Sequence, residues 1–225
     1  MSFNIVTKID DRVEIKNVLL SVFDKTGLEA LVKGIVAACP AARFFSTGGT
    51  HKTVAEILGD DARARLISVS DYTGQPEMQG GLVKTLDFKI YLGLLGEKYN
   101  DAHQSDLART GAVAFDMVVA NLYPFKQVVA QSGVTPEQAR TNIDIGGPCM
   151  IRAAAKNYIR VASVTDPADY AALTAELADG GGALSLATRF ALMKKAFAHT
   201  ASYDAAIAAH FTAAPTEAIA KTYGV

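Results

Sequence analysis

The 225-residue chain is poor in the residues that mark several specialised classes of protein. Its two cysteines, Cys39 and Cys149, are too few for a disulfide framework and lack the spacing of a zinc site. The four histidines are scattered and show no metal-ligand spacing: His51, His103, His199 and His210. The sequence therefore predicts no metal site, and a reducing, cytoplasmic compartment is expected.

Long apolar runs and a strong excess of one charge are also missing. No apolar run approaches the roughly 20 residues that span a bilayer, and the formal net charge is -1. The first residues alternate charged and apolar side chains, unlike a signal peptide. We therefore expect neither a membrane nor a nucleic acid as a partner.

What the chain does contain is an alternation of strand-like and helix-like segments. Strands are expected at 17–23, 42–46, 66–70, 115–123 and 159–165, and helices at 28–38, 52–58, 125–132, 135–142, 168–178 and 185–211. Residues 84–95 fit either structure. The alternation predicts an α/β fold with a parallel sheet covered by helices on both faces. We expect one domain over 1–225, with an α/β core at 17–165 and a mainly helical extension at 166–225.

Residues 142–157 combine a carboxylate, a Gly-Gly-Pro break and an alanine-rich segment with two cations. Pro148 suits the first position of a helix, and the amides around Gly146 and Gly147 would then face a polar or anionic ligand. The alternative is a strand, a turn and a buried helix with two solvated cations, Arg152 and Lys156. Spacing alone does not bring Asp144 and Lys156 together, because Pro148 to Lys156 is about 12 Å of helix.

Ligands of such folds bind beyond the carboxyl ends of the strands, which directs attention to the loops there. Residues 46–50, STGGT, form a glycine- and hydroxyl-rich turn from strand to helix that would hold a phosphate. An ordinary turn is the alternative, since the lysine and the spacing of a P-loop are missing. Lys84 follows a Gly-Gly pair and, taken alone, reads as a solvated lysine.

Taken together, these loops resemble the IMP cyclohydrolase domain, the amino-terminal half of the bifunctional enzyme that also carries AICAR transformylase. Eight segments match in the family's order: SVFDKTGL at 21–28, STGGT at 46–50, VSDYTGQPEM at 69–78, VKTL at 83–86, NLYPF at 121–125, NIDIGGP at 142–148, RAAAKN at 152–157 and KAFAHTASYDAAI at 195–207. The resemblance implies a methylglyoxal-synthase-like, Rossmann-like α/β fold with a C-terminal helical extension, here without the transformylase domain.

The resemblance also implies a reaction and partners. In the family, the carboxamide nitrogen of 5-formamidoimidazole-4-carboxamide ribonucleotide attacks the formyl carbon, and water leaves to give IMP in purine biosynthesis. Because nothing is oxidised and the ring closure is intramolecular, this implied reaction needs no cofactor and no metal. The implied partners are this purine nucleotide, a second copy of the chain in a homodimer, and a separate AICAR transformylase. Carried over by motif, the implied catalytic residues are Lys156 for proton transfer, Asp144, Lys84 and Tyr123.

The implied substrate-binding residues come from the same loops. They are Ser21, Asp24, Lys25, Thr26, Ser46, Thr47, Gly48, Gly49, Thr50, Val83, Thr85, Asn121, Ile145, Gly146 and Gly147. The resemblance places the phosphate on residues 46–50 and on Asp24 and Lys25, and the base or formyl oxygen near Asn121 and Gly146.

The chain departs from the family's pattern mainly in one loop. The departing residues are Phe23 for a serine, Leu82 for an arginine, Asp87-Phe88 for His-Pro and Tyr91-Leu92 for His-Gly. Two other functions stay open: a non-catalytic nucleotide-binding or partner subunit of a separate transformylase, and a methylglyoxal synthase or similar lyase. His199 and Tyr203 are expected in the core or a dimer interface rather than in catalysis.

Overall fold

The computed structural model describes residues 5–75 and 84–225. Its strands are β1 (Arg12–Glu14), β2 (Asn17–Ser21), β3 (Arg43–Ser46), β4 (Leu66–Ser68), β5 (Met117–Ala120), β6 (Ala162–Val164) and β7 (Ala183–Ser185). The α-helices are α1 (Leu28–Ala38), α2 (Gly48–Leu58), α3 (Ala62–Arg65), α4 (Val69–Thr73), α5 (Phe88–Leu95), α6 (Asp101–Thr110), α7 (Phe125–Val129), α8 (Pro136–Thr141), α9 (Gly146–Lys156), α10 (Tyr170–Asp179), α11 (Leu186–Ala213) and α12 (Thr216–Tyr223). Short 3₁₀ turns lie at Gly59–Asp61 and Pro167–Asp169.

A five-stranded parallel sheet forms the centre of the fold, in the order β4-β3-β2-β5-β6. The predicted parallel sheet is thereby confirmed. Its middle strand shows why: Val18, Leu19 and Leu20 are all fully buried, and successive side chains point to opposite faces. Val18 and Leu20 join one hydrophobic cluster and Leu19 joins the other.

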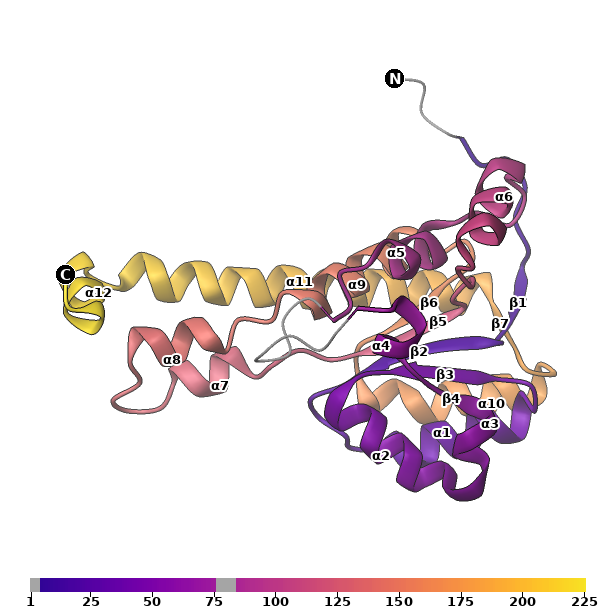
Figure 1. Cartoon of the computed structure of the whole chain (residues 1–225), viewed down its shortest axis with the longest axis horizontal. Coiled ribbons are helices and arrows are strands. Elements are labelled where there is room, and N and C mark those ends of the chain that lie inside the picture. Colours follow the sequence, from indigo (N-terminus) through magenta and orange to yellow (C-terminus); the bar gives the residue numbers. More distant parts are fainter. Residues whose placement is uncertain (1–4, 76–83) are drawn as a thin grey trace.

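Helices cover both faces of this sheet (Figure 1). The first cluster packs α1, α2 and α10 under the sheet through residues such as Leu31, Val54 and Leu173. The second packs α5, α9 and α11 over it through residues such as Leu94 and Ile151. The alanine-rich part of α9, Ala153–Ala155, is buried there, because small side chains let the helix approach the sheet closely.

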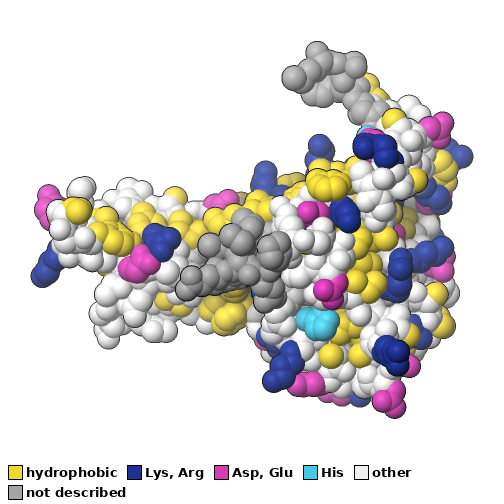
Figure 2. Space-filling view, in the orientation of Figure 1, with side chains coloured by type: hydrophobic (Ala, Val, Ile, Leu, Met, Phe, Trp, Pro, Cys, Tyr) yellow, Lys and Arg dark blue, Asp and Glu magenta, His cyan; other side chains and the backbone are white. Residues whose placement is uncertain are grey.

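The C-terminal half of α11 leaves the sheet and forms an extension with α7, α8 and α12 (Figure 1). Helix α8 starts as predicted, with Thr135 as N-cap, a capping box to Gln138, and Pro136 in the first turn. Figure 2 shows charged side chains of both signs scattered over the molecule, without one large patch of a single sign among the described residues of that face.

Several boundaries differ from the sequence-based expectation. Helix α9 begins at Gly146, so Pro148 is its third residue instead of its first; this still falls within the turn whose N–H groups lack helical partners. The strand expected at 66–70 ends at Ser68, where α4 begins. Residues 84–95 contain α5, begun by Asp87, whose carboxylate accepts the N–H of Lys89 at 2.8 Å.

Candidate functional site

The carboxyl ends of β2, β3 and β5 lie side by side, because Leu20 pairs with Ser46 and Ser21 with Ala120. The loops that leave these strands enclose a cavity of about 360 Å³ together with the start of α9. Its lining is Ser21, Val22, Phe23, Lys25, Thr47, Gly48, Gly49, Thr50, Lys84, Thr85, Leu86, Asn121, Tyr123, Asp144, Ile145, Gly146, Gly147 and Met150. This volume lies within the range of small-molecule sites.

Most of the residues singled out in the sequence converge on this cavity. Asp144, Lys84 and Tyr123 line it with most of the expected substrate-binding residues. Asp24, Thr26, Ser46 and Lys156 do not line it. Val83 and Leu82 lie outside the described residues.

One end of the cavity is formed by the amino terminus of α2. Gly48 has φ 49°, in the region that favours glycine, and a side chain on Gly49 would meet open space. The first N–H groups of a helix have no partner within it and carry partial positive charge. The Lys84 ammonium lies 3.8 Å from the position that a Cβ of Gly48 would occupy. These groups together are suited to an anion.

The hydroxyl groups of the same turn are already bonded to the protein. The Ser46 hydroxyl donates to the Leu20 carbonyl at 2.9 Å, and the Thr50 hydroxyl donates to the Val22 carbonyl at 3.0 Å. Thr50 also accepts the N–H of Val22 at 3.1 Å. Both hydroxyls therefore join neighbouring strands and loops, and their predicted contact with a phosphate is not favoured by this geometry.

Asn121 is likewise bound to a loop. Its Oδ1 accepts the N–H groups of Phe23 at 2.7 Å and Asp24 at 2.9 Å, and its Nδ2 donates to the Asp24 carbonyl at 2.8 Å. Asp24 in turn accepts from the backbone and hydroxyl of Thr26, which holds its pKa below the ordinary value. The amide of Asn121 shapes the loop that presents Lys25, and its predicted contact with the base is not favoured by this geometry.

Asp144 lines the same cavity directly before α9. Its Oδ1 accepts the N–H of Gly147 at 2.8 Å. Burial raises the pKa of the Asp144 carboxyl above its ordinary value, although the backbone N–H groups of Gly147 and Tyr123 act in the opposite direction. The group is a carboxyl partly removed from water, and perturbed groups of this kind that open on a cavity are candidates for a functional site.

The two glycines that follow Asp144 are required by packing. A Cβ on Gly146 would lie 2.6 Å from the Thr85 hydroxyl, and one on Gly147 would lie 2.7 Å from the Asp144 Oδ2. Both distances are shorter than van der Waals contact allows. The Gly-Gly pair therefore permits the loop carrying Thr85 and the carboxylate to approach the helix start closely.

Lys156 lies away from this cavity. It is exposed at the last residue of α9, the helix whose first residue, Gly146, lines the cavity. That separation along the helix axis is about 15 Å. Arg152, one turn earlier, places its guanidinium 5.5 Å from the centre of the Phe197 ring. Neither cation lines the cavity.

Two aromatic rings stand at the mouth of the cavity. Phe23 is 53% exposed and Tyr123 is 48% exposed, with ring centres 5.9 Å apart in an edge-on arrangement. The sequence identified Tyr123 by motif, but Phe23 only as a departure from the family's pattern. Met150, Val22 and Leu86 also line the cavity, and apolar residues of this kind carry no sequence signal that separates them from the core.

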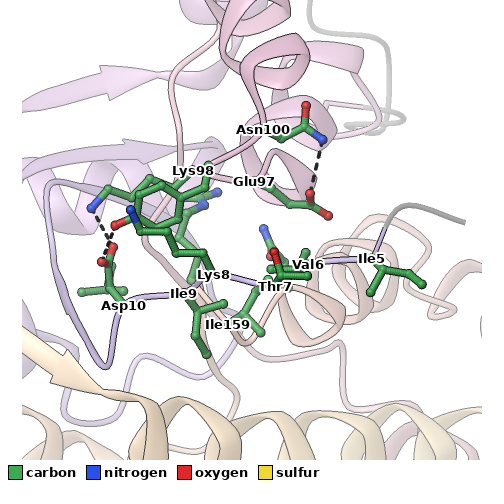
Figure 3. A pocket seen from close by; sticks show the side chains of 14 residues that line it. Ile5, Val6, Thr7, Lys8, Ile9, Asp10, Glu97, Lys98, Asn100 and Ile159 are labelled. Atoms are coloured by element: carbon green, nitrogen blue, oxygen red, sulfur yellow. Dashed lines mark hydrogen bonds and ion pairs between the residues drawn. The ribbon is translucent and has the colours of Figure 1, made fainter.

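A larger cavity, of about 610 Å³, lies near the amino ends of β5 and β6, under residues 5–10 (Figure 3). Two of its charged groups are paired, since Asp10 accepts from Lys98 at 2.6 Å and also from the Tyr99 hydroxyl at 2.6 Å. Asn100 donates to Glu97 at 3.5 Å. It lies at the edge of the sheet opposite to the loops described above, and none of the residues singled out for chemistry lines it.

Within the described ranges, no helix combines the length and the apolar character needed to cross a membrane. The same residues contain no group of three or more histidine, cysteine, aspartate or glutamate side chains arranged to hold a metal ion.

Comparison with known proteins identifies the class to which this fold and cavity belong. The family model for the MGS-like domain matches residues 27–149, more than half of the chain, and the chain belongs to this family. A second family model, described as AICARFT/IMPCHase bienzyme, matches residues 154–224.

The chain is homologous to the amino-terminal region of the bifunctional purine biosynthesis protein PurH. It is 46% identical to PurH of Neisseria gonorrhoeae (strain NCCP11945) over 198 residues, covering 88% of this chain and 36% of that protein. It is 46% identical to PurH of Sorangium cellulosum (strain So ce56) over 203 residues, covering 90% of this chain and 37% of that protein. The chain thus spans little more than a third of these relatives.

A solved structure, the crystal structure of ForH, matches over nearly its whole length. It is 31% identical, with a TM-score of 0.76, and the match covers 88% of this chain and 97% of ForH. The recognised resemblance and the fold that it implied are therefore confirmed.

Proposed function

We propose that this chain is an IMP cyclohydrolase, which closes the ring of 5-formamidoimidazole-4-carboxamide ribonucleotide to give IMP and water in purine biosynthesis. The observation that carries the proposal is the pairing, in one cavity, of an anion-binding end at α2 with a partly buried carboxylate at α9. A ribonucleotide monophosphate has the matching polarity, with a phosphate at one end and a base at the other.

The phosphate is placed at the start of α2. Amides of Gly48 and Gly49 and the Lys84 ammonium face that end, and Lys25 lines the cavity beside them. A dianionic phosphate gains from both the helix terminus and the cations. This assignment moves Lys84 from the reacting end, where the family resemblance put it, to the phosphate.

The base is placed between Tyr123 and Asp144. Ring closure forms a bond from the carboxamide nitrogen to the formyl carbon, and the formyl oxygen leaves as water. That oxygen takes up one proton released by the carboxamide nitrogen and one released by the formamido nitrogen. Asp144 accepts the carboxamide proton and returns it to the oxygen, while the Tyr123 hydroxyl polarises the formyl group. Proton transfer of this kind typically contributes about 10²–10⁴-fold.

The cavity also contributes by holding the reacting groups in contact. The two groups belong to one molecule, so the gain comes from freezing rotations about the bonds to the ring. Nothing is oxidised or reduced in this scheme, and no cofactor enters it.

A second function, binding of a purine nucleotide without turnover, is favoured by one observation. Lys156, predicted to transfer the proton, is exposed and does not line the cavity. Its catalytic role is therefore a prediction that the geometry of a single chain does not support. The predicted homodimer and separate transformylase are further proposals, and sedimentation of the purified chain tests the first of them.

One experiment separates these functions. The purified chain is incubated with the formamido nucleotide, and IMP formation is followed by its absorbance; IMP affinity is measured by calorimetry on the same sample. We expect both binding and turnover. Binding of IMP without any turnover would replace the cyclohydrolase proposal by the binding one. Turnover of dihydroxyacetone phosphate to methylglyoxal would contradict both.

A further inference from the structure

Tyr203 of α11 contacts the backbone on both sides of the turn that carries Asp144. Its hydroxyl accepts the N–H of Asp144 at 2.8 Å and donates to the Asn142 carbonyl at 3.2 Å. One hydroxyl group thus fills both of its main bonding roles within a three-residue turn. The residue is 7% exposed, so water does not readily replace these bonds.

The Tyr203 ring is itself fixed by its neighbours. The ring of Phe125, which is 1% exposed, lies 6.3 Å from it at an angle of 70°. Both rings belong to the hydrophobic cluster that also contains Leu122 and Met150, two residues at the wall of the site. Because a tyrosine ring held in a packed cluster has little freedom, its hydroxyl is a fixed point against which the turn is placed.

The carboxylate of Asp144 is therefore held in two ways. Its side chain accepts the N–H of Gly147, and its own N–H is held by Tyr203. We infer that Tyr203 is a positioning residue for Asp144, which fixes the carboxylate in the cavity through the backbone of the 142–144 turn. This inference rests on the proposed function for its consequence in catalysis.

Tyr203 acts through Asp144 because it does not line the candidate cavity itself. Its place is in the neighbouring hollow beyond Tyr123, formed by α7 and α11. Removing the hydroxyl leaves the partly buried N–H of Asp144 without this partner, and we expect the turn to move or water to enter in response. Either change returns the carboxylate to a more hydrated environment.

The chain offers a matched control in Tyr72. Its hydroxyl accepts the N–H of Val113 at 2.8 Å, the same kind of bond at the same length. Tyr72 is half-buried in the same hydrophobic layer, and it does not line the candidate cavity. Tyr72→Phe therefore removes an equivalent bond without touching the 142–144 turn.

The test uses Tyr203→Phe and Tyr72→Phe in the full chain. Carbon-13 NMR follows the titration of the Asp144 carboxyl in the free protein, and steady-state kinetics give kcat and KM for cyclisation. Lys25, Lys84 and Tyr123, which line the same cavity, and Tyr203 itself are the titratable neighbours included in the fit. Both variants are compared below the onset of their thermal unfolding.

We expect Tyr203→Phe to lower the pKa of Asp144 towards its ordinary value. We expect kcat to fall by roughly 10- to 100-fold with a smaller change in KM, because the carboxylate is misplaced rather than lost. Tyr72→Phe should change neither quantity. An Asp144 titration in Tyr203→Phe that matches the unsubstituted chain would overturn the inference.

The NMR measurement keeps this test independent of the proposed reaction. If the unsubstituted chain shows no cyclisation while Tyr203→Phe still shifts the Asp144 titration, the proposed function fails and the positioning of Asp144 by Tyr203 stands. If cyclisation is observed and the Asp144 titration does not move in Tyr203→Phe, the proposed function stands and the positioning of Asp144 by Tyr203 fails.

Discussion

The two edges of the sheet use buried polar groups in opposite ways. At the amino ends of the strands, Arg160 donates to the carbonyls of Gly96 and Phe115 at 3.1 and 2.8 Å and to Asp116 at 3.3 Å. Asp116 also accepts the N–H groups of Lys16 and Asn17. At the carboxyl ends, the partly buried Asp144 faces a cavity that it shares with lysine and tyrosine.

This difference distinguishes buried charges that hold the fold together from a charged group that can act on a ligand. A buried charge whose bonding capacity is used by the surrounding chain holds elements together, and it has nothing to offer a ligand. A partly buried carboxylate that opens on a cavity keeps bonding capacity for a ligand, and the protein tolerates the cost. Four substitutions test this contrast between the two edges.

The largest effect on stability is expected at the amino edge. Arg160→Ala leaves Asp116 buried without its cation and leaves several carbonyls unpaired, so we expect the free energy of unfolding to fall by about 3–5 kcal/mol. Urea denaturation measures it. Arg109→Ala, at an exposed arginine that pairs with Asp106, is the control and should change stability little. A similar small change in both variants would show that Arg160 is not structural.

At the carboxyl edge, Asp144→Asn should mainly change the activity, whereas Arg160→Ala mainly changes the stability. We expect kcat to fall by about 10²–10⁴-fold, while an asparagine oxygen still accepts the N–H of Gly147. Because burial raises the folded pKa of Asp144 above its ordinary value of 3.8, ionisation costs stability as the pH rises above that value, and the cost is complete above the folded pKa.

The stability of the original chain relative to Asp144→Asn should therefore decline as the pH rises from 3.8 through the folded pKa. Denaturation of both proteins at a series of pH values checks the sign. A relative stability that increases with pH would show that the carboxylate is stabilised in the fold, contrary to its raised pKa.

Lys84→Met should weaken recognition of the phosphate. Loss of one charged contact to a phosphate costs about 1.5–3 kcal/mol, so the dissociation constant of IMP should rise by roughly 10- to 150-fold. Calorimetry with inosine, which lacks the phosphate, separates this effect from contacts to the base, because inosine binding should be unchanged. Lys33→Met, at an exposed lysine of α1 paired with Glu29, is the control. Equal weakening of IMP and inosine would place Lys84 at the base instead.

Lys156→Ala should have the smallest effect on the fold and on binding. An exposed residue off the cavity should change stability by no more than about 0.5 kcal/mol, and the IMP affinity should be unchanged. The turnover of this variant decides the proton-transfer prediction. Near-normal turnover removes Lys156 from the mechanism, whereas its loss with intact IMP binding would require that the lysine reach the nucleotide from another chain.

The sheet and most helices could be predicted because their signals are local. Runs such as Asn17–Ser21 and the periodic apolar residues of α1 specify an element and its buried face within a few residues. The pair β1 and β7 was missed because each strand has three residues and joins chain segments about 170 residues apart. Helix α6 was missed because its sequence is polar, with Leu107 as its buried residue.

The sequence predicted which residues line the cavity better than it predicted what each of them does there. Motifs brought residues such as Gly48 and Asp144 to the right loops, since the carboxyl ends of parallel strands share one edge. No sequence feature showed that the hydroxyls of Ser46 and Thr50 and the amide of Asn121 are engaged by the backbone. Those bonds join segments 26 to 98 residues apart. Lys156 lies far from the cavity because α9 is a continuous helix. The sequence spacing between Pro148 and Lys156 already suggested this separation.

Helix α11 has one further consequence, because it reaches both edges of the sheet. Near its start, Arg189 donates to the carbonyls of Asp10 and Asp11 at 2.9 and 3.0 Å; further along, Tyr203 holds the amide of Asp144. The two positions are about 21 Å apart along the helix. Hydrogen exchange at the Asp144 amide therefore requires that this end of α11 open, so its exchange rate reports the local unfolding free energy of the helix. If unfolding begins at the C-terminal part of α11, the Asp144 carboxylate loses its fixed position before the sheet unfolds.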